Sequence, residues 1–174
     1  MQQPTETLPT GLEARQRVSA LYQTHALALK KLAFVMTGDQ PTAEDIVQDA
    51  FLGLCRRWPS LHESDNALGY VRTSVLNGCR SVHRVRFRRQ GITLDAPEDT
   101  ASAEDLAILG EANREVLSAI RRLPARQREA VVLRYYLDMT QDQAARAMGV
   151  SPGTVKSATS RGLAALARML KEDK

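Results

Sequence analysis

Apolar residues recur three and four positions apart along most of the chain, and no segment shows the strict alternation of apolar and polar residues that marks a strand. This period predicts helices at about 12–36, 43–57 and 67–88, and four more beyond residue 111, separated by breaks at 123–124, 138–140 and 149–151. Thr42 is the expected N-cap of the second helix, with Asp45 three positions later. The pattern predicts an all-α protein.

The last of these breaks has the residues of a tight turn between two helices. Thr140 and Gln143 have the spacing of a capping box at the start of a short helix. Gly149 follows where a helix end favours a left-handed residue. Ser151 and Pro152 then supply a cap and a first-turn proline for the next helix. These features predict a helix-turn-helix, with an ordinary helical corner that binds no nucleic acid as the alternative.

The helix after this turn is two-faced. The inward residues are predicted to be Val155, Leu163, Leu166 and Leu170, and the outward ones Ser157, Ser160, Arg161, Ala164 and Arg168, with Thr154 in the first turn and Lys156 on the flank. No acidic residue occurs between positions 151 and 171. Short polar side chains allow close approach to DNA, and Lys and Arg can reach bases or phosphates, so this face suits the major groove.

The helix at 43–57 has a core stripe and a second, polar stripe. The core stripe consists of Ile46, Val47, Ala50, Phe51 and Leu54, and the other of Asp45, Gln48, Asp49 and Leu52. A face that combines acids with an exposed leucine can dock on a basic partner. Taken alone, it is equally the composition of ordinary protein surface.

The helix at 67–88 is also two-faced. Its inward residues are Leu68, Val71, Val75, Cys79 and Val82, and its other stripe consists of Tyr70, Thr73, Asn77, Arg80 and Arg84. Aromatic, amide and hydroxyl groups interleaved with arginine suit unstacked bases and a phosphate backbone, which indicates single-stranded nucleic acid. Trp58, just before this helix, is either a stacking platform or a core residue.

The charges reverse sign along the chain. The formal net charge is only +4, but 66–94 contains six arginines and no acid, 91–111 contains six acids and no Lys or Arg, and 112–174 contains twelve basic and six acidic residues. Two basic blocks around an acidic one favour a polyanionic partner over a merely solvated surface. The reversals predict two small domains joined by an acidic flexible linker at 91–111. The polar N-terminus at 1–13 is expected to be disordered.

The sequence contains no arrangement typical of an enzyme or a metalloprotein: no nucleophile beside a base, no phosphate-binding glycine loop, and no metal-ligand cluster. We therefore expect no catalysis, metal or cofactor. Cys55 and Cys79 are both expected to be buried free thiols. No signal peptide or membrane-length apolar run is evident, so the chain is expected to be cytoplasmic.

Three segments resemble the extracytoplasmic-function sigma factors, the smallest class of the sigma-70 family. They are LYQTHALALKKLAFVMTGDQPTAEDIVQDAFLGLCRRW at 21–58, YVRTSVLNGCRSVHRVRFRR at 70–89 and LPARQREAVVLRYYLDMTQDQAARAMGVSPGTVKSATSRGLAAL at 123–166. The resemblance implies region 2 at 14–90, which binds core polymerase and the −10 element, and region 4 at 112–174, whose helix-turn-helix binds the −35 element. It also implies initiation at specific promoters and, commonly, control by an anti-sigma factor.

The resemblance assigns partners to the three polar faces. Asp45, Gln48, Asp49 and neighbouring residues would bind the clamp coiled coil of the largest polymerase subunit, and the polymerase flap is a further expected partner. Asn77 and the Arg80 stripe would read the melted −10 element, and the helix at 152–164 the −35 duplex. The alternative is a helix-turn-helix regulator that binds an operator and never contacts polymerase, but such regulators usually dimerise and no clean dimer seam is evident.

Overall fold

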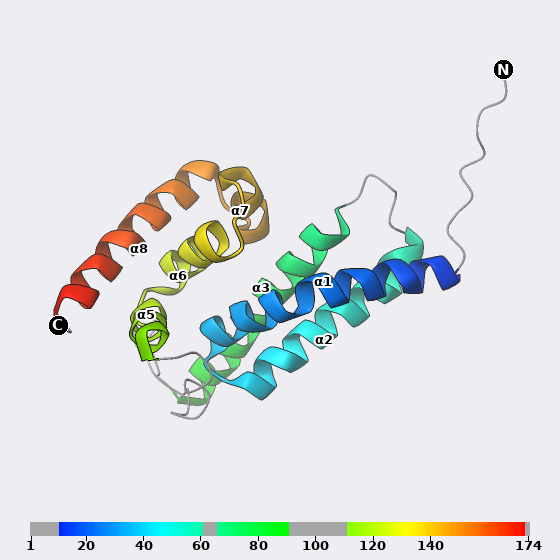
Figure 1. The fold of residues 1–174 in the computed structure, drawn as a ribbon, viewed down its shortest axis with the longest axis horizontal. Coiled ribbons are helices and arrows are strands. Elements are labelled where there is room, and N and C mark those ends of the chain that lie inside the picture. The colour runs from blue at the N-terminus through cyan, green and yellow to red at the C-terminus, as the bar shows by residue number, and fades with distance from the viewer. Residues whose placement is uncertain (1–10, 61–65, 91–110, 173–174) are drawn as a thin grey trace, which may run out of the picture.

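The computed structural model describes residues 11–60, 66–90 and 111–172, and every regular element within them is helical. The elements are α1 (Gly11–Thr37), α2 (Gln40–Arg57), the 3-10 turn η1 (Trp58–Ser60), α3 (Ala67–Gln90), α5 (Glu111–Arg121), α6 (Ala125–Val131), the π-helical turn η2 (Val132–Tyr136), α7 (Gln141–Met148) and α8 (Pro152–Glu172). Helices α1–α3 form one bundle, here the N-terminal lobe, and α5–α8 pack beside it as the C-terminal lobe (Figure 1). The all-α prediction is confirmed.

Two boundaries differ from the sequence-based expectation. Helix α1 already begins at Gly11, inside the stretch 1–13 that was expected to be disordered. Glu111, the last residue of the expected linker, begins α5. The remainder of both stretches, 1–10 and 91–110, lies outside the described residues.

Helix α2 is capped by Asp39 and not by Thr42, so that prediction was wrong. The Thr42 amide donates to Asp39 Oδ2 at 2.8 Å, and this hydrogen bond lowers the pKa of the Asp39 carboxyl. The reason lies one residue earlier, where Gly38 adopts a left-handed φ of 75° and reverses the chain so sharply that the next helix starts at Gln40.

One continuous cluster of buried apolar residues runs through both lobes. All five predicted core residues of α2 belong to it, as do Val71, Val75 and Cys79 of α3, while Leu68 and Val82 are only partly buried. Leu76, which was not among the predicted inward residues of this helix, is fully buried as well. The cluster continues into the C-terminal lobe through Leu133 and Val155. The two lobes thus share a hydrophobic core in this arrangement.

Helix α8 packs on α6 along a seam of small residues. A Cβ at Gly162 would lie 2.7 Å from Val131 Cγ2 and 3.3 Å from the Gln127 carbonyl oxygen, so only glycine fits there without movement. Ala158 is buried on the same side of the helix. Leu163, predicted to point inward, is 37% exposed, because the buried face is centred on these small residues and leaves Leu163 at its edge.

The two cysteines differ in environment. Cys79 is buried, as expected, but Cys55 is exposed, which corrects the prediction. Leu54 occupies the inward position on α2, and Cys55 lies about 100° further round the helix. Burial raises the pKa of the Cys79 thiol to about 12.

Gly162→Leu is expected to lower the free energy of unfolding by about 1–3 kcal/mol, because the added side chain must force α8 away from α6. Ala164→Leu on the exposed side of the same helix serves as the control and should change it by less than about 0.5 kcal/mol. Urea denaturation followed by circular dichroism measures both. Equal losses for the two variants would show that the seam is not tightly packed.

In the folded protein, one of the two thiols should react rapidly with an aromatic disulfide reagent at pH 8, and both after denaturation. The raised pKa keeps Cys79 as a neutral thiol at that pH, and burial excludes the reagent, whereas Cys55 is accessible. Cys55→Ser should abolish the rapid reaction. Rapid modification of two thiols in the native wild type would contradict the burial of Cys79.

Candidate nucleic-acid interface

The turn between α7 and α8 has the geometry that its sequence predicts. Thr140 and Gln143 form the reciprocal capping box at the start of α7. Gly149 ends the helix in the left-handed region with φ of 67°, and its amide donates to the Arg146 carbonyl. The Val150 amide donates to the Ala145 carbonyl at 3.1 Å. These paired bonds satisfy the last carbonyls of α7 and fix the angle at which the chain enters α8.

The first turn of α8 is held by side-chain hydrogen bonds. Ser151 Oγ accepts from the Thr154 amide at 3.2 Å and lies 2.9 Å from Thr154 Oγ1. Gln141 Nε2, from the start of α7, donates to the Pro152 carbonyl at 3.0 Å and so ties the two helices together. The N-terminal end of α8 is therefore rigid before any ligand binds, which lowers the entropic cost of binding.

The predicted base-reading residues lie on one accessible face of α8. Lys156, Ser157, Ser160 and Arg161 are exposed, and Thr154 is half-buried. Arg161 Nε donates to the Ser157 carbonyl at 3.3 Å, which lays the guanidinium along the helix surface. Val155 is fully buried on the opposite side, as predicted.

The predicted single-strand stripe on α3 is only partly free. Asn77 and Arg84 are exposed, whereas Tyr70 and Thr73 are half-buried. The Arg57 guanidinium lies 5.6 Å from the centre of the Tyr70 ring, close enough for a cation–π contact. Trp58 is half-buried and packs against the core cluster. Of the two roles that the sequence left open, a stacking platform or a core residue, the structure therefore shows the core contact.

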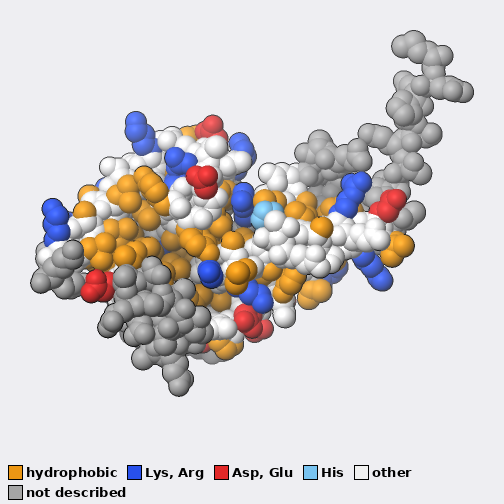
Figure 2. Space-filling view, viewed as in Figure 1, with side chains coloured by type: hydrophobic (Ala, Val, Ile, Leu, Met, Phe, Trp, Pro, Cys, Tyr) orange, Lys and Arg blue, Asp and Glu red, His pale blue; other side chains and the backbone are white. Residues whose placement is uncertain are grey.

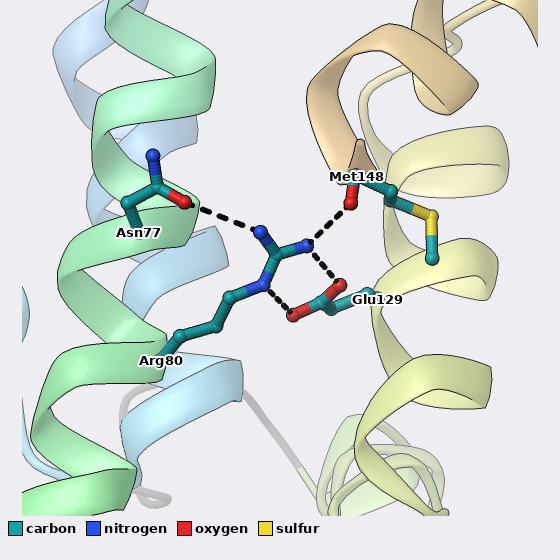
Figure 3. A network of polar contacts seen from close by, with 4 residues as sticks. All are labelled: Asn77, Arg80, Glu129 and Met148. Atoms are coloured by element: carbon teal, nitrogen blue, oxygen red, sulfur yellow. Dashed lines mark hydrogen bonds and ion pairs between the residues drawn. The ribbon is translucent and has the colours of Figure 1, made fainter. Parts of the chain in front are cut away.

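Arg80, in the middle of this stripe, is bound by the C-terminal lobe (Figure 3). Its Nε and Nη2 donate to the two carboxylate oxygens of Glu129 at 2.8 and 2.7 Å. Nη2 also donates to the Met148 carbonyl at the end of α7, and Nη1 to Asn77 Oδ1. The Glu129 side chain is only 5% exposed. Hydrogen bonding to Glu129 raises the pKa of Arg80.

A second set of polar contacts converges on the C-terminus of α1, and one of them joins the two lobes. Arg128 Nη1, from α6, and His83 Nε2, from α3, both donate to the Met36 carbonyl, at 3.2 and 2.6 Å. Arg86 Nη1 donates to the Thr37 carbonyl at 2.8 Å. Burial lowers the pKa of Arg128 to about 10 and also lowers that of His83. Sequence reasoning missed Arg128 and Glu129, because nothing local distinguishes them from the other charged residues around them.

The polar face of α2 is accessible. Asp45, Gln48, Asp49 and Leu52 are all exposed, Leu52 by 54%. Asp49 and Tyr70 line the same groove of about 370 Å³ between α2 and α3. The faces predicted for polymerase and for single-stranded DNA are therefore contiguous.

Figure 2 shows hydrophobic side chains gathered over the C-terminal lobe, with charged side chains scattered across the same view.

Among the described residues, no helix is both long and apolar enough to cross a membrane. No group of three or more His, Cys, Asp or Glu side chains in this part of the chain could hold a metal ion.

Comparison with known families agrees with this architecture. The chain belongs to the sigma-70 family: residues 21–91 match the model for Sigma-70 region 2, and residues 113–166 match the model for Sigma-70, region 4. Within the family, its relatives place it among the extracytoplasmic-function RNA polymerase sigma factors. An operator-binding regulator is not favoured, because region 2 is matched as well as the helix-turn-helix.

The chain is 30% identical to the ECF RNA polymerase sigma factor BldN of Streptomyces coelicolor, over 88% of this chain and 60% of BldN. It is 32% identical to the RNA polymerase sigma-E factor of the same organism, over 83% of this chain and 80% of that one. Among solved structures, it resembles the sigma factor RpoE of Bartonella quintana in complex with the anti-sigma factor NepR. That match has a TM-score of 0.69 and 25% identity, and it covers 90% of this chain and 99% of RpoE.

Proposed function

We propose that this sigma factor directs promoter-specific initiation by contacting core polymerase through α2, the melted −10 element through α3 and the −35 duplex through α8. The observation that carries the proposal is the exposed, acid-free face of α8, presented by a helix-turn-helix in a chain that also matches region 2. The two DNA-binding surfaces are small, so we infer that each alone binds weakly and that polymerase brings them together on the promoter.

The N-terminal half of α8 is the duplex reader in this proposal. Thr154, Ser157 and Ser160 are short enough to let the helix approach base edges, while Lys156 and Arg161 reach bases or phosphates. The buried seam below them holds this face outward. The order of this surface before binding favours a rigid insertion into the major groove.

Single-stranded DNA would follow the stripe on α3. Tyr70 and the neighbouring Trp58 offer aromatic faces for stacking, and Thr73 and Asn77 offer groups that can hydrogen-bond to base edges. Arg80 and Arg84 would bind the phosphate backbone. Arg80 must first leave Glu129 to do so.

The exposed face of α2 is the proposed polymerase contact. Asp45 and Asp49 supply negative charge, and Gln48 and Leu52 supply a hydrogen-bonding and an apolar contact beside them. The partner implied by the family is the clamp coiled coil of the largest subunit, with the flap contacted by the C-terminal lobe. We further infer that the factor acts in the cytoplasm, uses no cofactor and performs no chemistry itself. An anti-sigma factor is a further proposed partner, since the similar RpoE was solved with one.

The decisive experiment adds the purified protein to core RNA polymerase and genomic DNA fragments and maps the 5′ ends of the transcripts. The proposal expects a stable complex with polymerase and initiation at a limited set of sites that the core enzyme alone does not use. DNA binding without polymerase binding would instead favour an operator-binding regulator.

Asp49→Arg should weaken binding to core polymerase by at least about tenfold, because it reverses the charge at the centre of the α2 face. Glu115→Arg, which makes the same change at an exposed site on α5, is the matched control and should have little effect. Fluorescence anisotropy with labelled sigma factor measures both affinities. Unchanged binding by Asp49→Arg would show that this face is ordinary surface.

Arg161→Ala should weaken promoter binding by the holoenzyme about tenfold while leaving affinity for core polymerase unchanged, because the lost contact is to the −35 duplex. Arg168→Ala removes the same charge two turns further along α8 and should cost less. Filter binding on a mapped promoter gives the comparison. An equal loss of polymerase affinity would refute the assignment of Arg161 to DNA.

A further inference from the structure

The Tyr70 ring, which the proposed function uses as a stacking surface, is positioned by two residues of α2. A Cβ at Gly53 would lie only 3.2 Å from Tyr70 Oη, so the absence of a side chain there lets the hydroxyl end of the ring approach α2 closely. Arg57, one helical turn further along α2, places its guanidinium carbon over the ring, 5.6 Å from the ring centre. The ring is therefore held at its hydroxyl end, and an arginine side chain lies over one of its faces.

The Arg57 side chain is held over the ring only weakly. It is exposed, and the structure records no ion pair for it within residues 11–60, 66–90 and 111–172. Its neighbour Arg56, by contrast, donates from Nε to the Leu52 carbonyl at 3.3 Å and so lies along the surface of its own helix. A single cation–π contact at an exposed site contributes little to stability. Arg57 can therefore move off the ring at small cost when another planar group takes its place.

An unstacked base fits between these two groups. Every nucleobase is planar and stacks either on an aromatic ring or on the flat face of a guanidinium. Stacked planes are about 3.4 Å apart, so a base between two such groups needs about 6.8 Å. The guanidinium carbon is 5.6 Å from the ring centre, so it has to withdraw by only about 1 Å, which an exposed side chain allows.

We propose that Arg57 and Tyr70 form a clamp for one unstacked base of the melted strand, with the base between the guanidinium and the phenol ring. The inference rests on the proposed binding of single-stranded DNA along α3, and it adds Arg57 of α2 to that site. Both sides of the clamp recognise a planar π surface, so the clamp accepts any base and fixes the path of the strand rather than its sequence. A strand held there has its next bases beside Thr73 and Asn77, which follow Tyr70 by about one and two turns of α3.

Arg57→Lys separates stacking from charge, because an ammonium group keeps the positive charge but has no planar face. The probe is a fluorescein-labelled non-template strand that spans the −10 region of a promoter mapped with the wild-type protein, and it is titrated with the holoenzyme. We expect Arg57→Lys to weaken binding of this strand about tenfold. Arg56→Lys makes the same change at the neighbouring exposed arginine and should stay within about twofold of the wild type, since the charge is retained.

Abasic strands show whether Arg57 acts on a base. Each nucleotide of the probe is replaced in turn by an abasic one, which removes the base and keeps the phosphate. At one position the wild type should lose about tenfold in affinity and then bind as weakly as Arg57→Lys, which loses little further. At the other positions the difference between the two proteins should persist. Tyr70→Leu should give the same pattern, and adding Arg57→Lys to it should weaken binding little more.

Equal binding of the intact strand by Arg57→Lys and the wild type overturns the clamp, because the charge of Arg57 alone would then matter. A difference that persists at every abasic position also overturns it, because Arg57 would then act on the backbone or on the fold. Affinity for core polymerase without DNA should be the same for the wild type, Arg56→Lys and Arg57→Lys, and a loss confined to Arg57→Lys would assign this residue to the polymerase contact instead. Failure of the proposed function is distinguishable, because the wild-type holoenzyme would then not bind the intact strand, and the clamp would be overturned with it.

Discussion

The end of a buried helix leaves carbonyl groups without partners, and at the C-terminus of α1 these groups take their donors from both lobes. Met36 accepts from Arg128 and His83, and Thr37 accepts from Arg86. The two arginines also complement the negative end of the helix dipole. The remaining geometry depends on this junction: α3 is aligned along α1 by His83 and Arg86, and α6 is docked by Arg128, which brings the adjacent Glu129 within reach of Arg80.

The charged groups at and beside this junction specify one arrangement of the lobes. Burial lowers the pKa of Arg128 to about 10, so its charge is retained near neutral pH, and it donates hydrogen bonds to the backbone carbonyls of Met36 and Leu123. The ion pair of this interface is Arg80–Glu129. An ion pair taken out of water recovers in Coulomb attraction roughly what it loses in hydration, so its net contribution to stability is small while its geometric demands are strict. Lobes held in this way have a defined arrangement that depends more on exact geometry than on a large gain in stability.

Sequence reasoning succeeded where a local pattern determines the structure. The capping box at Thr140, the left-handed Gly149 and the buried stripe of α2 depend on neighbours within one or two turns, and the structure confirms them. Sequence reasoning failed where contacts between distant segments determine the position of a side chain. Arg80 and Glu129 are 49 residues apart, so neither could be recognised as the partner of the other. The inward face of α8 was misplaced toward Leu163 because Ala158, which is buried, and Gly162, which lies closely against α6, carry almost no apolar side chain for a pattern to detect.

The seam at Gly162 also determines how far α8 projects from the protein. Thr154 lies eight residues before Gly162, or about 12 Å along the helix axis, so a tilt of about 10° at the seam moves it by about 2 Å. That is a quarter of the depth of the major groove, which is about 8.5 Å. Gly162 faces α6 and not the proposed DNA-binding surface. It would still influence how far the residues on that surface enter the major groove. Sigma factors with the same DNA-facing side chains but different residues at this seam would therefore place that face differently in the groove. Their promoter preferences would differ although the residues that face the DNA are identical.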